Sequence, residues 1–168
     1  ILAFLYRIFV NNILIIGEKR FFLESKNYKD TRISKIFFLY KLHYIRRPAF
    51  TMFFRSLYQF LWNFTVIGGI YKHYEYWMIP YILAENPRIS KKNAFFLSRQ
   101  LSNHNKKKLL LLDLSFLGWK MLSLLSLGLV DFLYVNPYMA TCKAELYLTL
   151  RRNYVLSRSP GYEYLDDS

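Results

Sequence analysis

The sequence predicts an all-helical protein, a multi-pass bundle of transmembrane helices with amphipathic helices on its cytoplasmic side. Hydrophobic residues make up 54% of the 168 residues and aromatic residues 20%, whereas soluble domains contain about 45 to 50% apolar residues with glycine included. The basic residues are also clustered, because nine of the 24 Lys and Arg lie in residues 17–50 and seven in residues 85–108. A soluble fold spreads charge over its surface helices, whereas a membrane protein gathers it into loops.

The apolar segments are the expected crossings. A hydrocarbon core about 30 Å thick requires roughly 20 helical residues at 1.5 Å each. We therefore expect five crossings in this chain, at about residues 1–16, 51–66, 70–84, 109–127 and 130–150. Because the chain begins at Ile1 inside an apolar run, we expect a further helix upstream and six in the full protein.

Glycines are the expected turns between paired crossings, since glycine allows a tight chain reversal. Gly68–Gly69 would join the second crossing to the third, and Gly128 the fourth to the fifth. The basic regions then fall on one side, which the positive-inside rule assigns to the cytoplasm. This topology gives a transmembrane domain over residues 1–152 and a cytoplasmic tail over residues 153–168.

Two of the basic regions contain amphipathic patterns. Pro87 and Ser90 could start a helix ending near residue 103, and a second helix is expected at residues 34–48. Such helices could lie along a membrane surface and bind anionic headgroups or a partner protein. The candidate residues for this docking are Lys91, Lys92, Arg99, Lys106, Lys107 and Lys108.

Charged residues within the apolar segments are candidates for function because burying them in lipid is costly. Asp113, Lys120 and Asp131 could form a polar path, with partners supplied by another helix, or could merely hold helices together. Lys72, His73 and Glu75 could form a proton-sensitive cluster at the outer face or a simple polar turn.

The sequence contains no reaction motif. It has no phosphate-binding glycine loop, no His-Glu-x-x-His and no Gly-x-Ser-x-Gly pattern. The single cysteine, Cys142, excludes an internal disulfide and a cysteine-based metal cluster. We therefore expect a non-enzymatic protein without metal or cofactor. Despite the net charge of +13, we expect no nucleic-acid binding, because most aromatics lie in Leu-rich segments away from the basic residues.

Several strings together resemble a family of bacterial membrane proteins, the domain of unknown function 975. They are the strings at residues 10–25, 76–101, 109–129 and 135–151, including PYILAENP, LDLSFLGW and VNPY. The resemblance implies a multi-pass protein of the bacterial cytoplasmic membrane and implies no activity. The chain departs from the family at Gly68–Gly69, where a Pro-Gly turn is usual, and at residues 103–106, where Gly-His-Lys-Trp is usual.

Three functions remain open from the sequence. The first is a non-enzymatic integral subunit or accessory factor of a bacterial export or transport complex, with the lipid bilayer and other membrane protein subunits as partners. The second is a small transporter or permease that uses the intramembrane polar path. The third is a protein that protects against a membrane-active peptide.

Overall fold

The computed structural model describes residues 6, 10–27, 36–41, 45–103, 105–125 and 130–166. Within these ranges every regular element is a helix, so the predicted all-α class is confirmed. The principal helices are α2 (Asn12–Asn27), α3 (Phe38–Lys41), α4 (Arg46–Asn63), α5 (Val66–Tyr76), α6 (Ile79–Glu85), α7 (Lys91–Asn103), α8 (Lys106–Ser115), α9 (Leu117–Leu125), the π-helical segment η3 (Asp131–Val135), α10 (Asn136–Leu156) and α11 (Glu163–Asp166).

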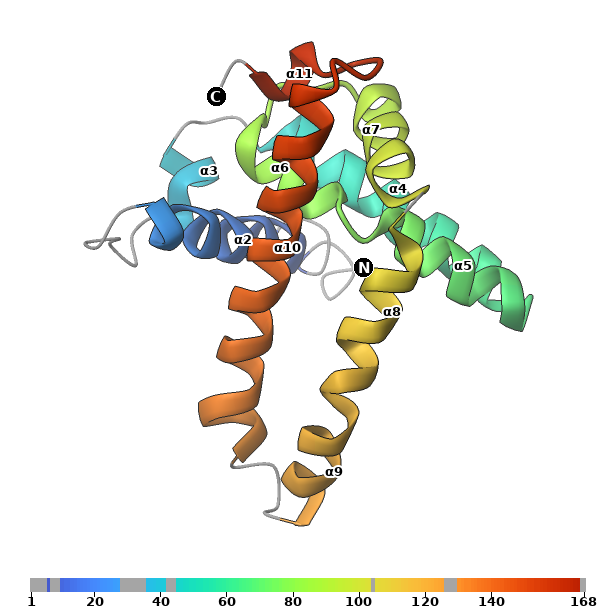
Figure 1. Cartoon of the computed structure of the whole chain (residues 1–168). Coiled ribbons are helices and arrows are strands. Elements are labelled where there is room, and N and C mark those ends of the chain that lie inside the picture. The colour runs from blue at the N-terminus through green and yellow to red at the C-terminus, as the bar shows by residue number, and fades with distance from the viewer. Residues whose placement is uncertain are drawn as a thin grey trace.

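The helices form a bundle from which two arms project (Figure 1). Helices α2 to α7 and the C-terminal half of α10 make up the bundle. Helices α8 and α9 run away from it, and η3 with the first half of α10 runs back. Contacts of α9 with η3 close the far end of the arms, and contacts of α8 with α5 join the first arm to the bundle.

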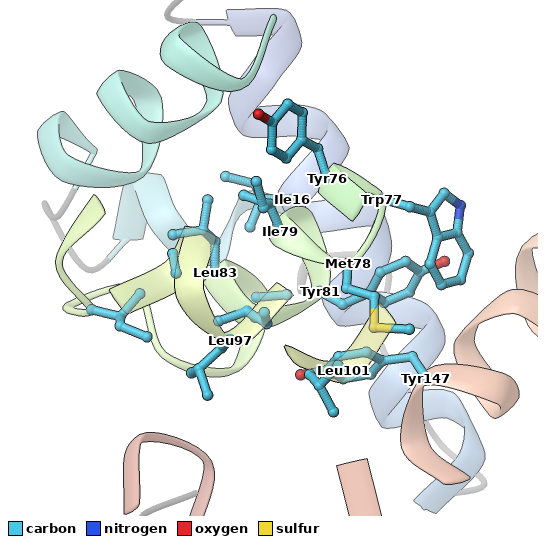
Figure 2. Packing of buried hydrophobic residues seen from close by; sticks show 14 of the residues in the cluster. Ile16, Tyr76, Trp77, Met78, Ile79, Tyr81, Leu83, Leu97, Leu101 and Tyr147 are labelled. Carbon is cyan, nitrogen blue, oxygen red and sulfur yellow. The ribbon is translucent and has the colours of Figure 1, made fainter. Parts of the chain in front are cut away.

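Helix α6 is the centre of the core. All residues from Met78 to Ala84 are buried, because this short segment is enclosed by neighbours on every side. Figure 2 shows Ile16 of α2, Leu97 and Leu101 of α7 and Tyr147 of α10 packed around it. Burying one large apolar side chain stabilises a fold by about 1.5 to 3 kcal/mol, so the helices are held mainly through α6.

The predicted multi-pass transmembrane bundle is wrong for the residues that the structure describes. None of the helices there combines the length and the apolar character that crossing a membrane requires. The predicted location in a bacterial cytoplasmic membrane, with basic loops and the C-terminus on the cytoplasmic side, depended on those crossings and is corrected with them.

Four of the predicted crossings are interrupted, each in a different way. The 70–84 segment is divided between α5 and α6 at Trp77–Met78, and the 109–127 segment is broken at Phe116 between α8 and α9. The 130–150 segment changes from η3 to α10, a helix that carries both acidic and basic residues. The 51–66 segment is divided at Phe64–Thr65 between α4, which contributes Arg55 to it, and α5. Most of the first segment lies outside the described residues.

Two expectations about the chain's turns are also wrong. The first predicted crossing ends at about residue 16, but α2 continues without a break through Gly17 to Asn27. Gly68 and Gly69 lie in the first turn of α5, and the reversal itself is at Phe64–Thr65. An added Cβ at Gly68 would stand 2.8 Å from the Trp62 ring, so glycine is needed there for the close approach of α5 to α4. The predicted turn at Gly128 lies outside the described residues.

One of the two predicted amphipathic helices is confirmed, and the other is wrong in extent. Helix α7 begins directly after Ser90, whose Oγ accepts a hydrogen bond from the Asn93 N–H at 3.2 Å, as expected of an N-cap. The predicted helix at residues 34–48 is wrong in extent, because among the described residues α3 and α4 are separate helices and Ile45, directly before α4, is not helical.

Candidate functional site

Glu75, near the end of α5, is the centre of a polar cluster at the junction of α5 and α7. The residue is 2% exposed. Lys72 Nζ donates to both carboxylate oxygens, at 3.0 and 2.9 Å, and Arg99 Nε donates to Oε1 at 2.7 Å. Ser98 Oγ donates to the backbone carbonyl of Glu75 at 2.6 Å. Burial would raise the pKa of Glu75, but the hydrogen bonds from Lys72 and Arg99 outweigh it and hold that pKa below its ordinary value.

His73 does not join this cluster, although the sequence groups it with Lys72 and Glu75. Its ring packs edge to face on Tyr74, with the centroids 5.4 Å apart. Burial, followed by the charge of Arg55, lowers the pKa of His73 from its ordinary value. The structure therefore pairs two of the three predicted residues and separates the third, and their predicted role stays a prediction.

A pocket of about 390 Å³ opens beside Glu75, between α7 and the helices α4 and α5. We call it the basic pocket. Its lining combines three cations and one carboxylate with four aromatic rings: Tyr58, Glu75, Tyr76, Lys91, Lys92, Phe95, Phe96 and Arg99.

The face of α7 explains this composition. Lys91, Phe95 and Arg99 are spaced four residues apart, as are Lys92 and Phe96, so the five side chains stand along one side of the helix. Phe95 is held between the other two helices, since its ring centroid lies 5.6 Å from that of Tyr58 on α4 and 5.2 Å from that of Tyr76 on α5.

The cations of the pocket remain accessible. Lys91, Lys92 and Arg99 are all exposed, and Lys91 Nζ lies 3.6 Å from the centre of the Phe54 ring. The structure thus brings together three of the six basic residues predicted to dock headgroups or a partner.

The other three, Lys106, Lys107 and Lys108, are the first residues of α8 and do not line the pocket. Lys106 Nζ lies 3.2 Å from the centre of the Tyr71 ring on α5, and Lys107 and Lys108 are exposed.

The residues of the predicted polar path are placed apart in the described structure. Asp113 forms an ion pair with Lys143 of α10 at 2.7 Å, so another helix does supply its partner. Lys120 is exposed on α9. Asp131 accepts a hydrogen bond from Asn136 at 3.3 Å. No interaction in the described ranges links the three, and a transport role for them stays a prediction.

A second buried cluster, around Glu85, is absent from the sequence-based candidates. Glu85 Oε2 accepts hydrogen bonds from the Tyr147 hydroxyl at 2.7 Å and from Arg151 Nε at 3.0 Å. Burial raises the pKa of Glu85 and that of Tyr147 above their ordinary values. Tyr147 and Arg151 stand four residues apart on α10, a spacing that puts them on one face, but nothing in the sequence pointed from there to Glu85, more than 60 residues away.

Arg55 of α4 is a further polar residue that joins two helices. In the structure its Nε donates to the backbone carbonyl of Tyr76 at 2.9 Å, and so satisfies the last residue of α5. Burial lowers the pKa of Arg55 to about 10.

The arm of α8 and α9 exposes large apolar side chains. Leu110 and Leu114 are four residues apart on α8, and Leu117 and Met121 are four residues apart on α9, so each pair lies on one face of its helix. The α8–α9 apolar surface consists of Leu110, Leu111, Leu114, Leu117, Trp119 and Met121, each at least 49% exposed. Large exposed apolar patches mark interaction sites.

No three His, Cys, Asp or Glu side chains gather in a possible metal site within the described ranges. Comparison with known proteins adds one match. The model of the family described as "Protein of unknown function (DUF975)" matches residues 1–154. No curated protein and no solved structure matches the chain.

Proposed function

Because the chain belongs to the DUF975 family of proteins of unknown function, no activity follows from the family, and we propose that it is a non-enzymatic accessory subunit. In this role it docks onto another protein of an export or transport assembly through the α8–α9 apolar surface. The observation that carries the proposal is the exposure of six large apolar residues on one projecting arm.

The energetics favour covering this surface. Transferring a large apolar side chain from water to a protein interior is worth about 1.5 to 3 kcal/mol. Burying six such side chains is worth on the order of 10 kcal/mol of free energy. Part of this gain is offset by the translational and rotational freedom that the two proteins lose on association. An apolar helical face in a partner would match it, since apolar surfaces of two helices pack ridge into groove.

A non-enzymatic role agrees with the side chains that are in contact. The acidic residues at the centres of the two buried clusters, Glu75 and Glu85, are both held by cations. His73, the histidine that the structure describes, packs against the ring of Tyr74. No observation in the structure favours the transporter or the peptide-protection hypothesis over this one.

Site-specific photo-crosslinking tests the proposal. A photoreactive residue in place of Leu114, in the full chain expressed in its native host, should form a crosslink to one defined partner protein. The variant L114Q/L117Q should lose that partner on purification. Leu156 provides the matched control, because it is a leucine 75% exposed at the far end of α10, and L156Q should retain the partner.

Two results would contradict the docking role. Crosslinks that reach only a second copy of this chain would indicate a homo-oligomer. Retention of the partner by L114Q/L117Q, at the same yield as by L156Q, would show that the partner binds elsewhere.

A further inference from the structure

The basic pocket contains more positive charge than its own carboxylate neutralises. Lys91, Lys92 and Arg99 line the pocket, and Lys72 forms an ion pair with Glu75. Glu75 is the acidic residue of the lining, and its carboxylate is already taken up by Lys72 and Arg99. Like charges gathered in one concavity repel one another, so an anion that enters the pocket relieves this repulsion.

The position of two of these cations is unfavourable for the helix itself. Lys91 and Lys92 are the first two residues of α7, and its first turn contains no acidic residue. The start of a helix carries a partial positive charge, which favours acidic residues there and disfavours lysines. Lys91 and Lys92 violate this preference, and no acidic residue on the same turn compensates for them. Such a violation is a sign of a functional requirement. An anion bound at this point would interact favourably with both lysines and with the helix start.

The guanidinium group of Arg99 is held in place at the basic pocket. Its Nε is bound to Glu75, which is in turn fixed by Lys72. The side chain nevertheless remains 62% exposed, so a ligand in the pocket can reach the guanidinium group. A planar guanidinium matches the oxygens of a phosphate group, and its orientation by a buried carboxylate reduces the entropy lost on binding.

The rest of the lining is aromatic. The ring of Phe95 contacts those of Tyr58 and Tyr76 edge to face, and Phe96 is 41% exposed at the pocket. A pocket of about 390 Å³ lies within the range of roughly 300 to 1,000 Å³ typical of sites for organic ligands. Such a volume leaves room beside the anionic group for an apolar moiety in contact with the rings.

We propose that the basic pocket binds a phosphate ester that carries an apolar group, with Lys91, Lys92 and Arg99 holding the phosphate and the aromatic rings holding the apolar part. A phospholipid headgroup and a free phosphorylated metabolite both have this chemistry. The site is distinct from the α8–α9 apolar surface, so either proposal can fail without the other.

Titration calorimetry on the purified full chain tests the site with four probes. They are dihexanoyl phosphatidylglycerol below its micellar concentration, hexyl phosphate, inorganic phosphate and hexanoate. We expect dihexanoyl phosphatidylglycerol to bind and hexanoate, which has a carboxylate and an apolar chain, to bind at least about tenfold more weakly. Hexyl phosphate, a free phosphate ester with an apolar chain, would identify a phosphorylated metabolite as the source if it binds as tightly as the lipid, and binding at least about tenfold weaker would identify a phospholipid.

Matched variants separate a specific site from general attraction to a basic protein. K92Q/R99Q should weaken binding of the phosphate ester by at least about tenfold, whereas K107Q/K108Q, which removes the same charge outside the pocket, should change it by less than about twofold. K92Q alone, which leaves the bond between Arg99 and Glu75 intact, should weaken binding by about threefold or more. Equal losses in the two double variants, equal binding of hexanoate, or no binding of any phosphate probe would overturn the proposal.

Discussion

Arg99 on α7 donates a hydrogen bond from Nε to Oε1 of Glu75 on α5, over 2.7 Å. The hydropathy pattern alone puts these residues on opposite faces of a bilayer, with Glu75 at the outer face and Arg99 in a cytoplasmic loop. Their direct contact instead makes α5 and α7 neighbours in one bundle. The same bond holds the guanidinium group at the edge of the basic pocket.

Replacing Glu75 with Gln should destabilise the protein by about 2 kcal/mol, because a hydrogen bond to a charged group is worth about 1.5 to 3 kcal/mol and Lys72 would be left partly buried without its counter-ion. Urea unfolding followed by circular dichroism measures the change. E163Q is the control, since Glu163 is exposed on α11, and its loss should stay within about 0.5 kcal/mol. Equal stability of the two variants would contradict a structural role for Glu75.

The acid dependence of stability should also change in the Glu75 variant. The pKa of Glu75 is lower in the folded protein than its ordinary value of 4.5, so its contribution is present above 4.5 and is lost as the pH falls through the lower, folded pKa. The wild-type protein should therefore lose more stability than E75Q between about pH 5 and pH 3. Parallel curves of unfolding free energy against pH would exclude this linkage.

Glu85 should show the opposite sign. Burial, its largest influence, raises the pKa of Glu85 above 4.5 in the folded protein. A raised pKa stabilises the fold below the unfolded value, and this contribution is lost as the pH rises through the folded pKa. Relative to E85Q, the wild-type protein should become less stable as the pH rises from about 4 to 7. A difference between the two proteins that grows in favour of wild type over this range would refute the expected sign.

The ion pair between Asp113 on α8 and Lys143 on α10 should stabilise the packing of the two arms against each other. The two side chains are 29% and 19% exposed, so D113N and K143Q should each cost about 1 kcal/mol of unfolding free energy. The double variant should cost less than the sum of the two, because each single change already breaks the pair. D113N combined with K120Q, at an exposed site with no ion pair to any residue that the structure describes, should instead be additive. Additivity of D113N with K143Q would contradict the interaction.

Two glycines within helices should respond in opposite directions to alanine. A Cβ at Gly17 would stand 1.8 Å from the Ile36 carbonyl oxygen, whereas a Cβ at Gly118 would meet no atom within 4 Å. G17A should therefore destabilise the protein by more than about 2 kcal/mol, since backbone must move. G118A should stabilise it by about 0.5 to 1 kcal/mol, because alanine is the better helix former. Thermal unfolding of the two variants side by side measures both changes, and a stabilised G17A would show that α2 and Ile36 are not in close contact.

The candidate site was only partly predictable from the sequence. The polarity of Lys91, Lys92 and Arg99 and their common helix face follow from local spacing, and α7 starts at the expected cap. The aromatic walls and Glu75 come from α4 and α5, and no local pattern relates residues so distant in the chain. The Glu85 cluster was missed for the same reason.

The sequence by itself determined the helical class, the start of α7 and the family to which the chain belongs, because helical periodicity, capping and recurring strings are local properties. Only the tertiary structure decided what surrounds the apolar helices and which charges meet. Hydropathy measures the preference of a side chain for an apolar environment over water, and a protein core and a lipid bilayer both satisfy that preference. The short, fully buried α6 at the centre of the bundle shows an apolar segment that other helices, rather than lipid, enclose.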